Sequence, residues 1–333
     1  MTRYLVQRLI GTIPVVLLVT FLVYGLMHLA PGDPASLLLP EDATPEDVAA
    51  IRQRWGLDQP FIIQYFYFVS NAVQGNLGRS FRFAQPVTEL IATRLPATVE
   101  LATFAILIAL AIALPLGVLA GARPDSPIDN LGTTVGLFGI SMPNFWFGIM
   151  LILIFAGTFH VLPSAGRSSY GIAGDPITGF YLVDSLVTGN WRALGDGIRH
   201  LILPAVTLGT ALAGIQMRIT RSAVLETSRE DYVLTARAKG LRNRVILWRH
   251  VLRNAWIPIV TVVGLELGTL LSGSIIVETV FGWPGVGNLL ITGITARDYP
   301  LVTGIVLMYT IAFVLINLVI DAIYAWADPR IRF

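Results

Sequence analysis

The chain has 333 residues, of which 54% are hydrophobic and only 13% are charged. An ordinary soluble domain carries about 25% charged residues, and here whole stretches lack charge, so the composition excludes a soluble globular protein. Cysteine is absent, which excludes disulfides and thiol nucleophiles, and the formal net charge is only +2.

Six apolar stretches are each long enough to cross the hydrocarbon core of a bilayer, which takes about 20 helical residues. The first is interpreted as a span and not as a cleaved signal peptide, because its apolar run is too long and no small-x-small cleavage site follows. The pattern predicts an all-α integral membrane protein with a single transmembrane domain over residues 1–333. The predicted spans are 10–29, 97–121, 131–158, 200–217, 258–280 and 301–325.

Six spans place both termini on one side of the membrane, and the basic residues indicate which side. With cytoplasmic termini, the inside segments hold 14 of the 23 Lys and Arg residues in 66 positions, whereas the outside segments hold 9 in 128 positions. The positive-inside rule expects this asymmetry. We therefore predict a multi-pass protein with both termini in the cytoplasm.

The external segment 30–96 predicts two further helices. The first is capped by Thr44, continues through a proline and two acids, and stops at Gly56. The second begins at Pro60, is rich in aromatic residues and ends near Gly75. Its length and aromatic content favour a helix at the outer membrane surface, with a seventh span as the alternative.

Residues 159–199 form the second external segment and are rich in Gly, Ser, Asp and Pro. This composition predicts an ordered external loop without a domain of its own.

Polar, small and helix-breaking residues within the spans are candidates for lining a substrate path. Glu266 lies deep in the fifth span, where a charge is costly; the alternative is a structural hydrogen bond between helices. Pro143 is expected to kink the third span. Small residues in the fourth span serve equally well as packing surfaces. The candidates are Ser141, Pro143, Asn144, Gly209, Gly214 and Glu266.

The sequence contains no recognisable motif of an enzyme. No phosphate-binding Gly-x-x-x-x-Gly-Lys-Ser/Thr loop occurs, and the only lysine, Lys239, is not preceded by a glycine run. The four histidines make no metal-ligand pattern. We expect a chain that is not an enzyme, holds no cofactor or metal and has no nucleic-acid partner.

The cytoplasmic loop 218–257 carries the most specific pattern. Its residues 218–253 hold nine bases and three acids, a net charge of +6. Between Ser228 and Lys239 the loop favours a helix, with acids early, bases late and a stop at Gly240. This predicts a short helix that docks a soluble partner; the alternative is a basic loop that only fixes topology and contacts anionic headgroups.

This loop resembles the coupling segment of ABC-importer permeases, in which Glu-Ala-Ala is followed by three residues and Gly. Ala236 and Gly240 match, whereas Leu234 and Thr235 replace the Glu and the first Ala. The form in this chain is very similar to that of the dipeptide, oligopeptide and nickel branch. Its residues are Asp231, Tyr232, Thr235, Ala236, Arg237, Ala238, Lys239, Gly240 and Leu241.

Seven further motifs extend the resemblance over nearly the whole chain. They are Ala30–Pro34, Gly75–Ser80, Ser141–Trp146, Leu162–Gly166, His200–Ala205, Val277–Gly285 and Arg297–Pro300. On their joint order and spacing, the chain is identified as a member of the inner-membrane permease subunits of the dipeptide/oligopeptide/nickel branch of ABC importers.

The resemblance implies a type I ABC-importer permease fold in a prokaryotic cytoplasmic membrane. A second permease, expected to be a related but different chain, would complete the pore, and two separate ATPase subunits would bind ATP and magnesium. Residues 231–241 would insert into a groove on an ATPase, and an external binding protein would meet segments 30–96 and 159–199.

The implied substrates are dipeptides and oligopeptides, with nickel complexes, glutathione and oligosaccharides as alternatives. A remote alternative is a proton- or sodium-coupled secondary transporter that uses Glu266. No internal repeat supports that alternative, and it leaves the loop pattern unexplained.

Overall fold

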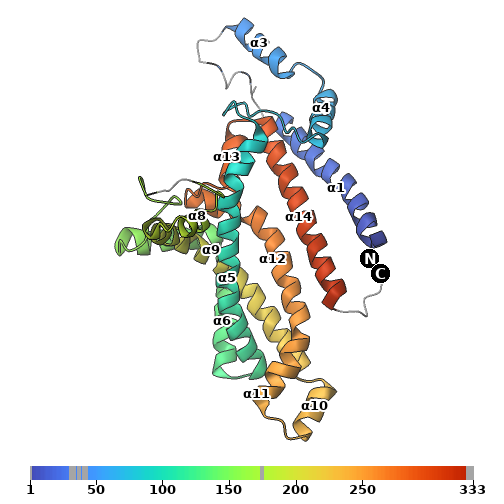
Figure 1. The fold of residues 1–333 in the computed structure, drawn as a ribbon, viewed down its shortest axis with the longest axis vertical. Coiled ribbons are helices and arrows are strands. Elements are labelled where there is room, and N and C mark those ends of the chain that lie inside the picture. Colours follow the sequence, from blue (N-terminus) through green and yellow to red (C-terminus); the bar gives the residue numbers. More distant parts are fainter. Residues whose placement is uncertain (1, 30–34, 36–38, 40–43, 173–175, 328–333) are drawn as a thin grey trace. The chain divides into compact units, whose positions relative to one another are not determined.

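The computed structural model describes residues 2–29, 35, 39, 44–172 and 176–327, so the motif Ala30–Pro34 lies outside the described residues (Figure 1). All secondary-structure elements of the described residues are helices, and π-helical turns occupy Ile152–Thr158 and Ile246–Val251. The α-helices are α1 (Thr2–Leu29), α3 (Pro45–Trp55), α4 (Phe61–Val73), α5 (Val87–Ala122), α6 (Pro127–Ser141), α7 (Asn144–Leu151), α8 (Tyr181–Val187), α9 (Trp191–Thr227), α10 (Asp231–Ala238), α11 (Asn243–Val245), α12 (Leu252–Val280), α13 (Val286–Thr295) and α14 (Tyr299–Ala327).

The helices form two compact units. The outer-segment unit comprises the described residues of Met1–Thr98 together with Pro284–Leu315. The loop unit comprises those of Val99–Trp283 together with Ile316–Arg332. Helices α5 and α14 contribute residues to both units.

Five described helices are long and apolar enough to cross a membrane, and a bent helix pair makes a sixth candidate, so the predicted all-α membrane fold is confirmed. The first span, residues 10–29, coincides with the apolar part of α1. Helices α5, α9 and α12 begin before the predicted spans, at Val87, Trp191 and Leu252. They do so because helices continue through polar flanks that an apolar window leaves out.

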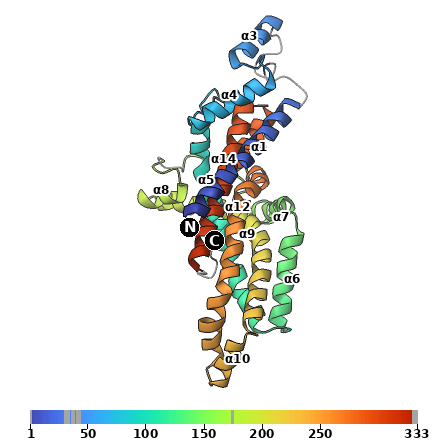
Figure 2. The ribbon, with the colours of Figure 1, turned by 90° about the vertical axis from the view of Figure 1, so that its right-hand side faces the viewer.

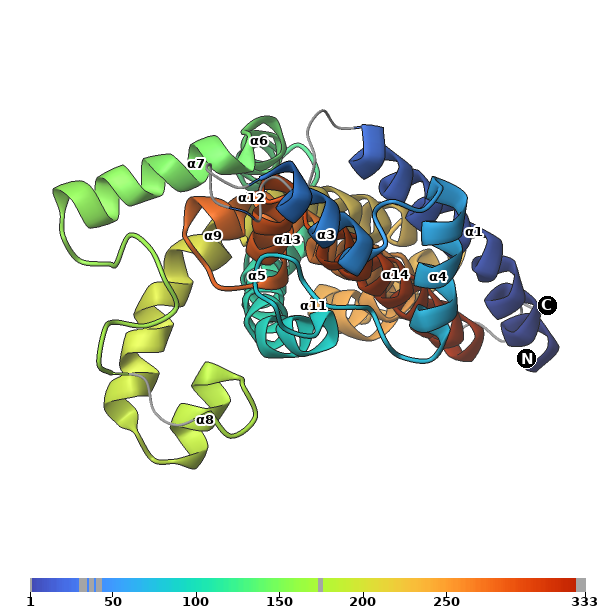
Figure 3. The same cartoon turned by 90° about the horizontal axis from the view of Figure 1, so that it is seen from above.

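The third predicted span, 131–158, is not one kinked helix. Helix α6 ends at Ser141, α7 begins at Asn144, and the two segments are bent by 99° (Figure 3). Met142 between them is extended, with φ −87° and ψ 128°. A residue before proline avoids the helical region and proline donates no hydrogen bond, so Pro143 ends one helix and starts the next.

In the outer-segment unit, α3 confirms its predicted start and end. The Thr44 hydroxyl accepts a hydrogen bond from the Asp47 N–H at 3.3 Å, and the Asp47 carboxylate accepts one from the Thr44 N–H at 3.0 Å. Gly56 ends the helix with φ 65°, in the left-handed region. This reciprocal cap satisfies two backbone donors that a helix start leaves without partners.

Helix α4 packs along α1 (Figure 3). The Tyr65 hydroxyl donates to the Leu17 carbonyl at 2.7 Å, and the rings of Phe21 and Phe61 meet edge to face at 5.3 Å. The aromatic residues that indicated a surface helix therefore also form its contact with the first span.

Asp298 joins two of the sequence motifs within the same unit. Its carboxylate accepts hydrogen bonds from the Ser80 hydroxyl, from the Arg82 N–H at 3.1 Å and from the Leu301 N–H at 3.2 Å. The last of these caps the start of α14. The motifs Gly75–Ser80 and Arg297–Pro300 thus meet, because one buried carboxylate binds both segments.

In the loop unit, α9 packs against α6, α7, α8 and α12, and Figure 2 shows α6, α9 and α12 side by side. Glycines set these close approaches. A Cβ at Gly139 would lie 2.6 Å from the Thr210 carbonyl oxygen, and one at Gly209 would lie 2.8 Å from that of Ala105. Such distances leave no room for a larger residue without moving the helices apart.

The segment 159–199, which the sequence predicts to be external, contains helices that were not predicted, namely α8 and the first turns of α9. Arg167 donates to the Glu100 carboxylate through Nε at 3.0 Å and Nη2 at 2.6 Å, and the Leu182 N–H donates to the same carboxylate at 2.9 Å. This buried acid at the end of a predicted span therefore fixes the loop that follows the third predicted span.

Candidate coupling site and substrate path

Helix α10 forms from the predicted coupling segment and ends as predicted. Gly240 has φ 76°, its N–H donates to the Arg237 carbonyl at 2.9 Å, and the Leu241 N–H donates to the Ala236 carbonyl at 3.3 Å. This is the glycine C-cap that leaves fewer carbonyls without partners. The helix starts at Asp231 and not at Ser228, because α9 runs on to Thr227.

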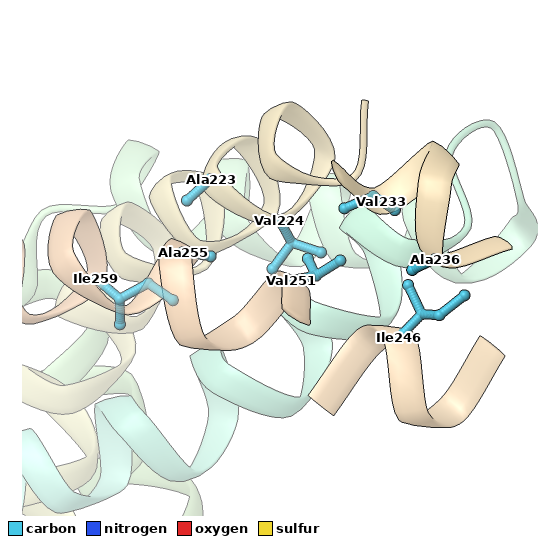
Figure 4. Close-up of a cluster of buried hydrophobic side chains, with 8 residues drawn as sticks. All are labelled: Ala223, Val224, Val233, Ala236, Ile246, Val251, Ala255 and Ile259. Atoms are coloured by element: carbon cyan, nitrogen blue, oxygen red, sulfur yellow. The ribbon is translucent and has the colours of Figure 1, made fainter. Parts of the chain in front are cut away.

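The inner face of α10 packs on an apolar cluster built from α9, α10, the second π-helical turn and α12 (Figure 4). From α10, Val233 is fully buried and Ala236 is 6% exposed. The cluster consists of Ala223, Val224, Val233, Ala236, Ile246, Val251, Ala255 and Ile259. Its burial stabilises α10 against both helices that enter the membrane from the loop.

A polar contact adds to this packing. Asn254 of α12 donates through Nδ2 to the Tyr232 hydroxyl at 2.7 Å and to the His250 carbonyl at 3.1 Å. Sequence reasoning did not identify Asn254, since nothing local marks a partner 22 positions away.

An ion pair joins the α9 end of the loop to α6. Arg221 approaches the Asp129 carboxylate through Nε at 2.5 Å and through Nη2 at 2.7 Å, and the Asp129 side chain is only 4% exposed. The pair spans 92 positions and was not predicted. It ties the loop to the helix that precedes the break at Pro143.

The predicted coupling residues divide between two faces of this structure. Ala236 points into the cluster, so it is not free to enter a groove on another protein. Leu234 is 52% exposed although the sequence treated it only as a departure from the family pattern. The other eight predicted residues are exposed: Asp231, Tyr232, Thr235, Arg237, Ala238, Lys239, Gly240 and Leu241.

The candidate path residues lie in different environments. Ser141 and Pro143 are exposed at the break between α6 and α7, and Asn144 lines a cavity of only about 10 Å³ against α9. Gly209 is buried against α5, and Gly214 is buried where Gly136 of α6 approaches it. The structure therefore places three of these candidates in or against α9, namely Asn144, Gly209 and Gly214, and the two glycines form close helix contacts there.

Glu266 is buried in α12, and its Oε1 has no hydrogen-bond partner among the described residues. Two positions earlier, a Cβ at Gly264 would lie 2.5 Å from the Ile320 side chain of α14. The predicted close approach of a helix beside Glu266 is thus present, whereas no hydrogen bond of the described residues joins Glu266 to the other candidates.

The described residues contain no group of three or more His, Cys, Asp or Glu side chains arranged to hold a metal ion.

Two family matches cover most of the chain. Residues 113–333 match the binding-protein-dependent transport system inner membrane component, and residues 1–102 match the N-terminal region of such membrane components.

Curated relatives align along the whole chain. It is 44% identical to the probable D,D-dipeptide transport system permease protein DdpB of Escherichia coli, over 98% of this chain and 96% of that protein. It is 40% identical to the dipeptide transport system permease protein DppB of Alkalihalophilus pseudofirmus, over 100% of both. It is 38% identical to the glutathione transport system permease protein GsiC of Salmonella typhimurium, over 100% of both.

Solved structures share the fold. A chain of the inward-facing MetNI methionine ABC transporter aligns with a TM-score of 0.54 at 18% identity, over 72% of this chain and 96% of that chain. A chain of an amino acid ABC transporter crystallised with histidines aligns with a TM-score of 0.51 at 16% identity, over 71% and 93%. The type I ABC-importer permease fold expected from the sequence is therefore present. The chain belongs to the family of binding-protein-dependent transport system inner membrane components.

Proposed function

We propose that this permease subunit carries dipeptides and short oligopeptides across the cytoplasmic membrane. Its relatives named above transport a dipeptide, a D,D-dipeptide and glutathione, which is itself a tripeptide. These names favour peptides over nickel complexes and oligosaccharides. Uptake of labelled dipeptide by membranes that contain the assembled transporter, competed by unlabelled peptides, glutathione, nickel complexes and oligosaccharides, tests this choice.

The pore would be shared with a second, related permease, and an external binding protein would deliver the peptide to segments 30–96 and 159–199. Two cytoplasmic ATPase subunits would bind ATP and magnesium, and this chain would bind neither. The path would include Ser141, Pro143, Asn144, Gly209, Gly214 and Glu266. In one state of the transporter the Glu266 carboxyl would face this path. In another state it would lie buried beside the contact between α12 and α14.

The observation that carries the coupling proposal is the packing of α10 against α9 and α12. The apolar cluster fixes its inner face and Asn254 binds the Tyr232 hydroxyl, whereas the outer face presents Leu234 and Arg237, with Lys239 directly after the helix. A partner that pushes on such a rigid helix moves α9 and α12 together, which is a rigid-body switch driven by differential binding.

The test compares two exposed apolar residues of the same loop. Leu234→Asp on α10 is expected to lower copurification of the ATPase and peptide-dependent ATP hydrolysis by at least tenfold, because it places a charge in the docking face. Val245→Asp on α11, which is 40% exposed, is the matched control and should leave both unchanged. Equal effects of the two variants, or none, would contradict docking through α10.

The remote alternative, a proton- or sodium-coupled secondary transporter that uses Glu266, is disfavoured by the family matches, which cover most of the chain. It predicts substrate uptake driven by a proton or sodium gradient without ATP, and loss of that uptake in Glu266→Gln. ATP-dependent uptake that ignores both ion gradients would eliminate it.

A further inference from the structure

An apolar groove of about 650 Å³ lies in the loop unit, between the last turns of α5 and the start of α12. Val118 and Leu119 line one wall, and Trp248, Leu252 and Trp256 line the other. Its volume lies within the range of about 300–1,000 Å³ that is usual for small-molecule sites. Val118 and Leu252 also pack against the cluster beneath α10, whereas Leu119, Trp248 and Trp256 belong neither to that cluster nor to the candidate path.

The wall formed by Trp248, Leu252 and Trp256 is a continuous stripe. Residues four apart share a helix face, and the two tryptophans are 64% and 53% exposed. Exposed tryptophans on membrane helices favour the boundary between hydrocarbon and headgroups, where the ring is buried and the indole N–H reaches polar groups.

Two arginines follow this stripe one position along. Arg253 lines the groove itself, and Arg249 is exposed one turn before it. Among the described residues, neither arginine has a carboxylate within ion-pair distance. The surrounding loop carries a net charge of +6, so an anionic group is favoured at this end of the groove.

We propose that this groove binds an anionic phospholipid, with an acyl chain between α5 and α12 and the phosphate paired with Arg253 and Arg249. A lipid fits better than a protein segment, because an acyl chain has no backbone polar groups to leave unpaired against an apolar lining. Arginines can lay their apolar stems along the groove and reach the headgroup region, next to the interfacial tryptophans. Their charge attracts an anionic headgroup there.

The test uses the assembled transporter, purified in mild detergent and titrated with phosphatidylglycerol or phosphatidylcholine, with bound lipid counted by native mass spectrometry. The unmodified complex should retain phosphatidylglycerol in preference to phosphatidylcholine. Arg253→Gln should weaken phosphatidylglycerol retention about fivefold, the effect expected for one arginine near a membrane surface. Arg229→Gln is the matched control, because Arg229 is an exposed loop arginine that lines a different cavity.

A second variant changes the shape of the groove without changing its charge. Leu119→Trp fills one wall and should reduce bound phosphatidylglycerol as strongly as Arg253→Gln does, while ATPase copurification is retained. Equal retention of both lipids, or no loss in either variant, would overturn the proposal. So would efficient crosslinking of Trp256→Cys to the second permease subunit, since the groove would then hold protein.

Discussion

At the scale of single residues, the Arg221–Asp129 pair is the most consequential contact that the sequence left unseen. Asp129 is almost wholly buried, whereas Arg221 is 28% exposed. The charge on Asp129 therefore depends on its partner more than the charge on Arg221 does. Removing the arginine leaves a buried carboxylate without its counter-charge, and removing the acid leaves an arginine that can still reach solvent.

We therefore predict an asymmetric pair of variants. Arg221→Ala should destabilise the protein by roughly 2–4 kcal/mol, reduced somewhat from the fully buried case because the arginine is partly solvated. Asp129→Asn should cost distinctly less. Thermal unfolding in detergent provides the measurement, with Arg218→Ala as control, because Arg218 is an exposed arginine one turn earlier in α9. Equal losses in all three variants would refute the asymmetry.

At the scale of helices, a glycine of α9 permits a close helix contact only where a neighbouring helix lies against it. Gly209 faces the Ala105 carbonyl of α5, whereas a Cβ at Gly195 of the same helix would meet no atom within 4 Å. The same substitution at these two positions therefore has opposite expected signs.

Gly209→Ala should destabilise the protein by about 1–3 kcal/mol, because overpacking forces two helices apart. Gly195→Ala should stabilise it by up to about 1 kcal/mol, because alanine favours the helix more than glycine does. Chemical or thermal unfolding of both variants side by side distinguishes packing from a simple propensity effect. A stabilising Gly209→Ala would disprove the close contact.

A second feature at the scale of helices lies in the segment 159–199, where a ring of hydrogen-bond donors surrounds the Asp184 carboxylate of α8. The Asp184 side chain accepts N–H groups of Ile177, Thr178 and Gly179 at 2.9–3.2 Å and the Thr178 hydroxyl at 2.6 Å. Burial alone would raise the pKa of Asp184, but these hydrogen bonds outweigh it and hold the pKa below its ordinary value of 3.8.

Because this pKa is depressed by folding, the stabilisation is fully present above the ordinary value and is lost as the pH falls through the lower folded value. Hydrogen exchange of residues 177–190, corrected for intrinsic rates, should stay constant from pH 7 to pH 5 and rise only below about pH 4. Asp184→Asn should raise it at neutral pH about thirtyfold, which corresponds to roughly 2 kcal/mol. Unchanged exchange in that variant would argue against the ring.

The elements that sequence predicted best are those fixed by neighbours in the chain. The cap at Thr44 and the stops at Gly56 and Gly240 follow from local backbone chemistry, and all three are present. The elements that it missed depend on distant partners. Helix α8 is short and is fixed by Glu100 from 82 positions away, and the pairing of Ser80 with Asp298 spans 218 positions.

The candidate site shows the same division. The family pattern identifies which residues form α10, but it does not say which of them face outward. Ala236 matches the pattern because its small side chain fits the cluster beneath α10, and Leu234 departs from it on the exposed face. Only the packing of α9 and α12 separates these two roles.

At the scale of the whole molecule, the absence of cysteine makes topology directly measurable. Single cysteines placed at Tyr170, in the predicted external segment, and at Arg229, in the coupling loop, should report opposite sides of the membrane. With both termini cytoplasmic, an impermeant maleimide should label Tyr170→Cys in intact cells and Arg229→Cys only after permeabilisation. The unmodified chain is the blank, and the reverse labelling pattern would invert the proposed orientation.

The Asp298 contact also bears on how the protein is made. Ser80 and Arg82 leave the ribosome long before their acceptor does, since 218 residues separate Ser80 from Asp298. At about 5–20 residues per second, that separation corresponds to roughly 10–40 s of synthesis. During this interval Ser80 and Arg82 have already left the ribosome, whereas the carboxylate that binds them does not yet exist. The segment that contains Ser80 and Arg82 therefore reaches its final structure only when Asp298 and the start of α14 have been synthesised. Folding of the outer-segment unit is completed late in synthesis for this reason.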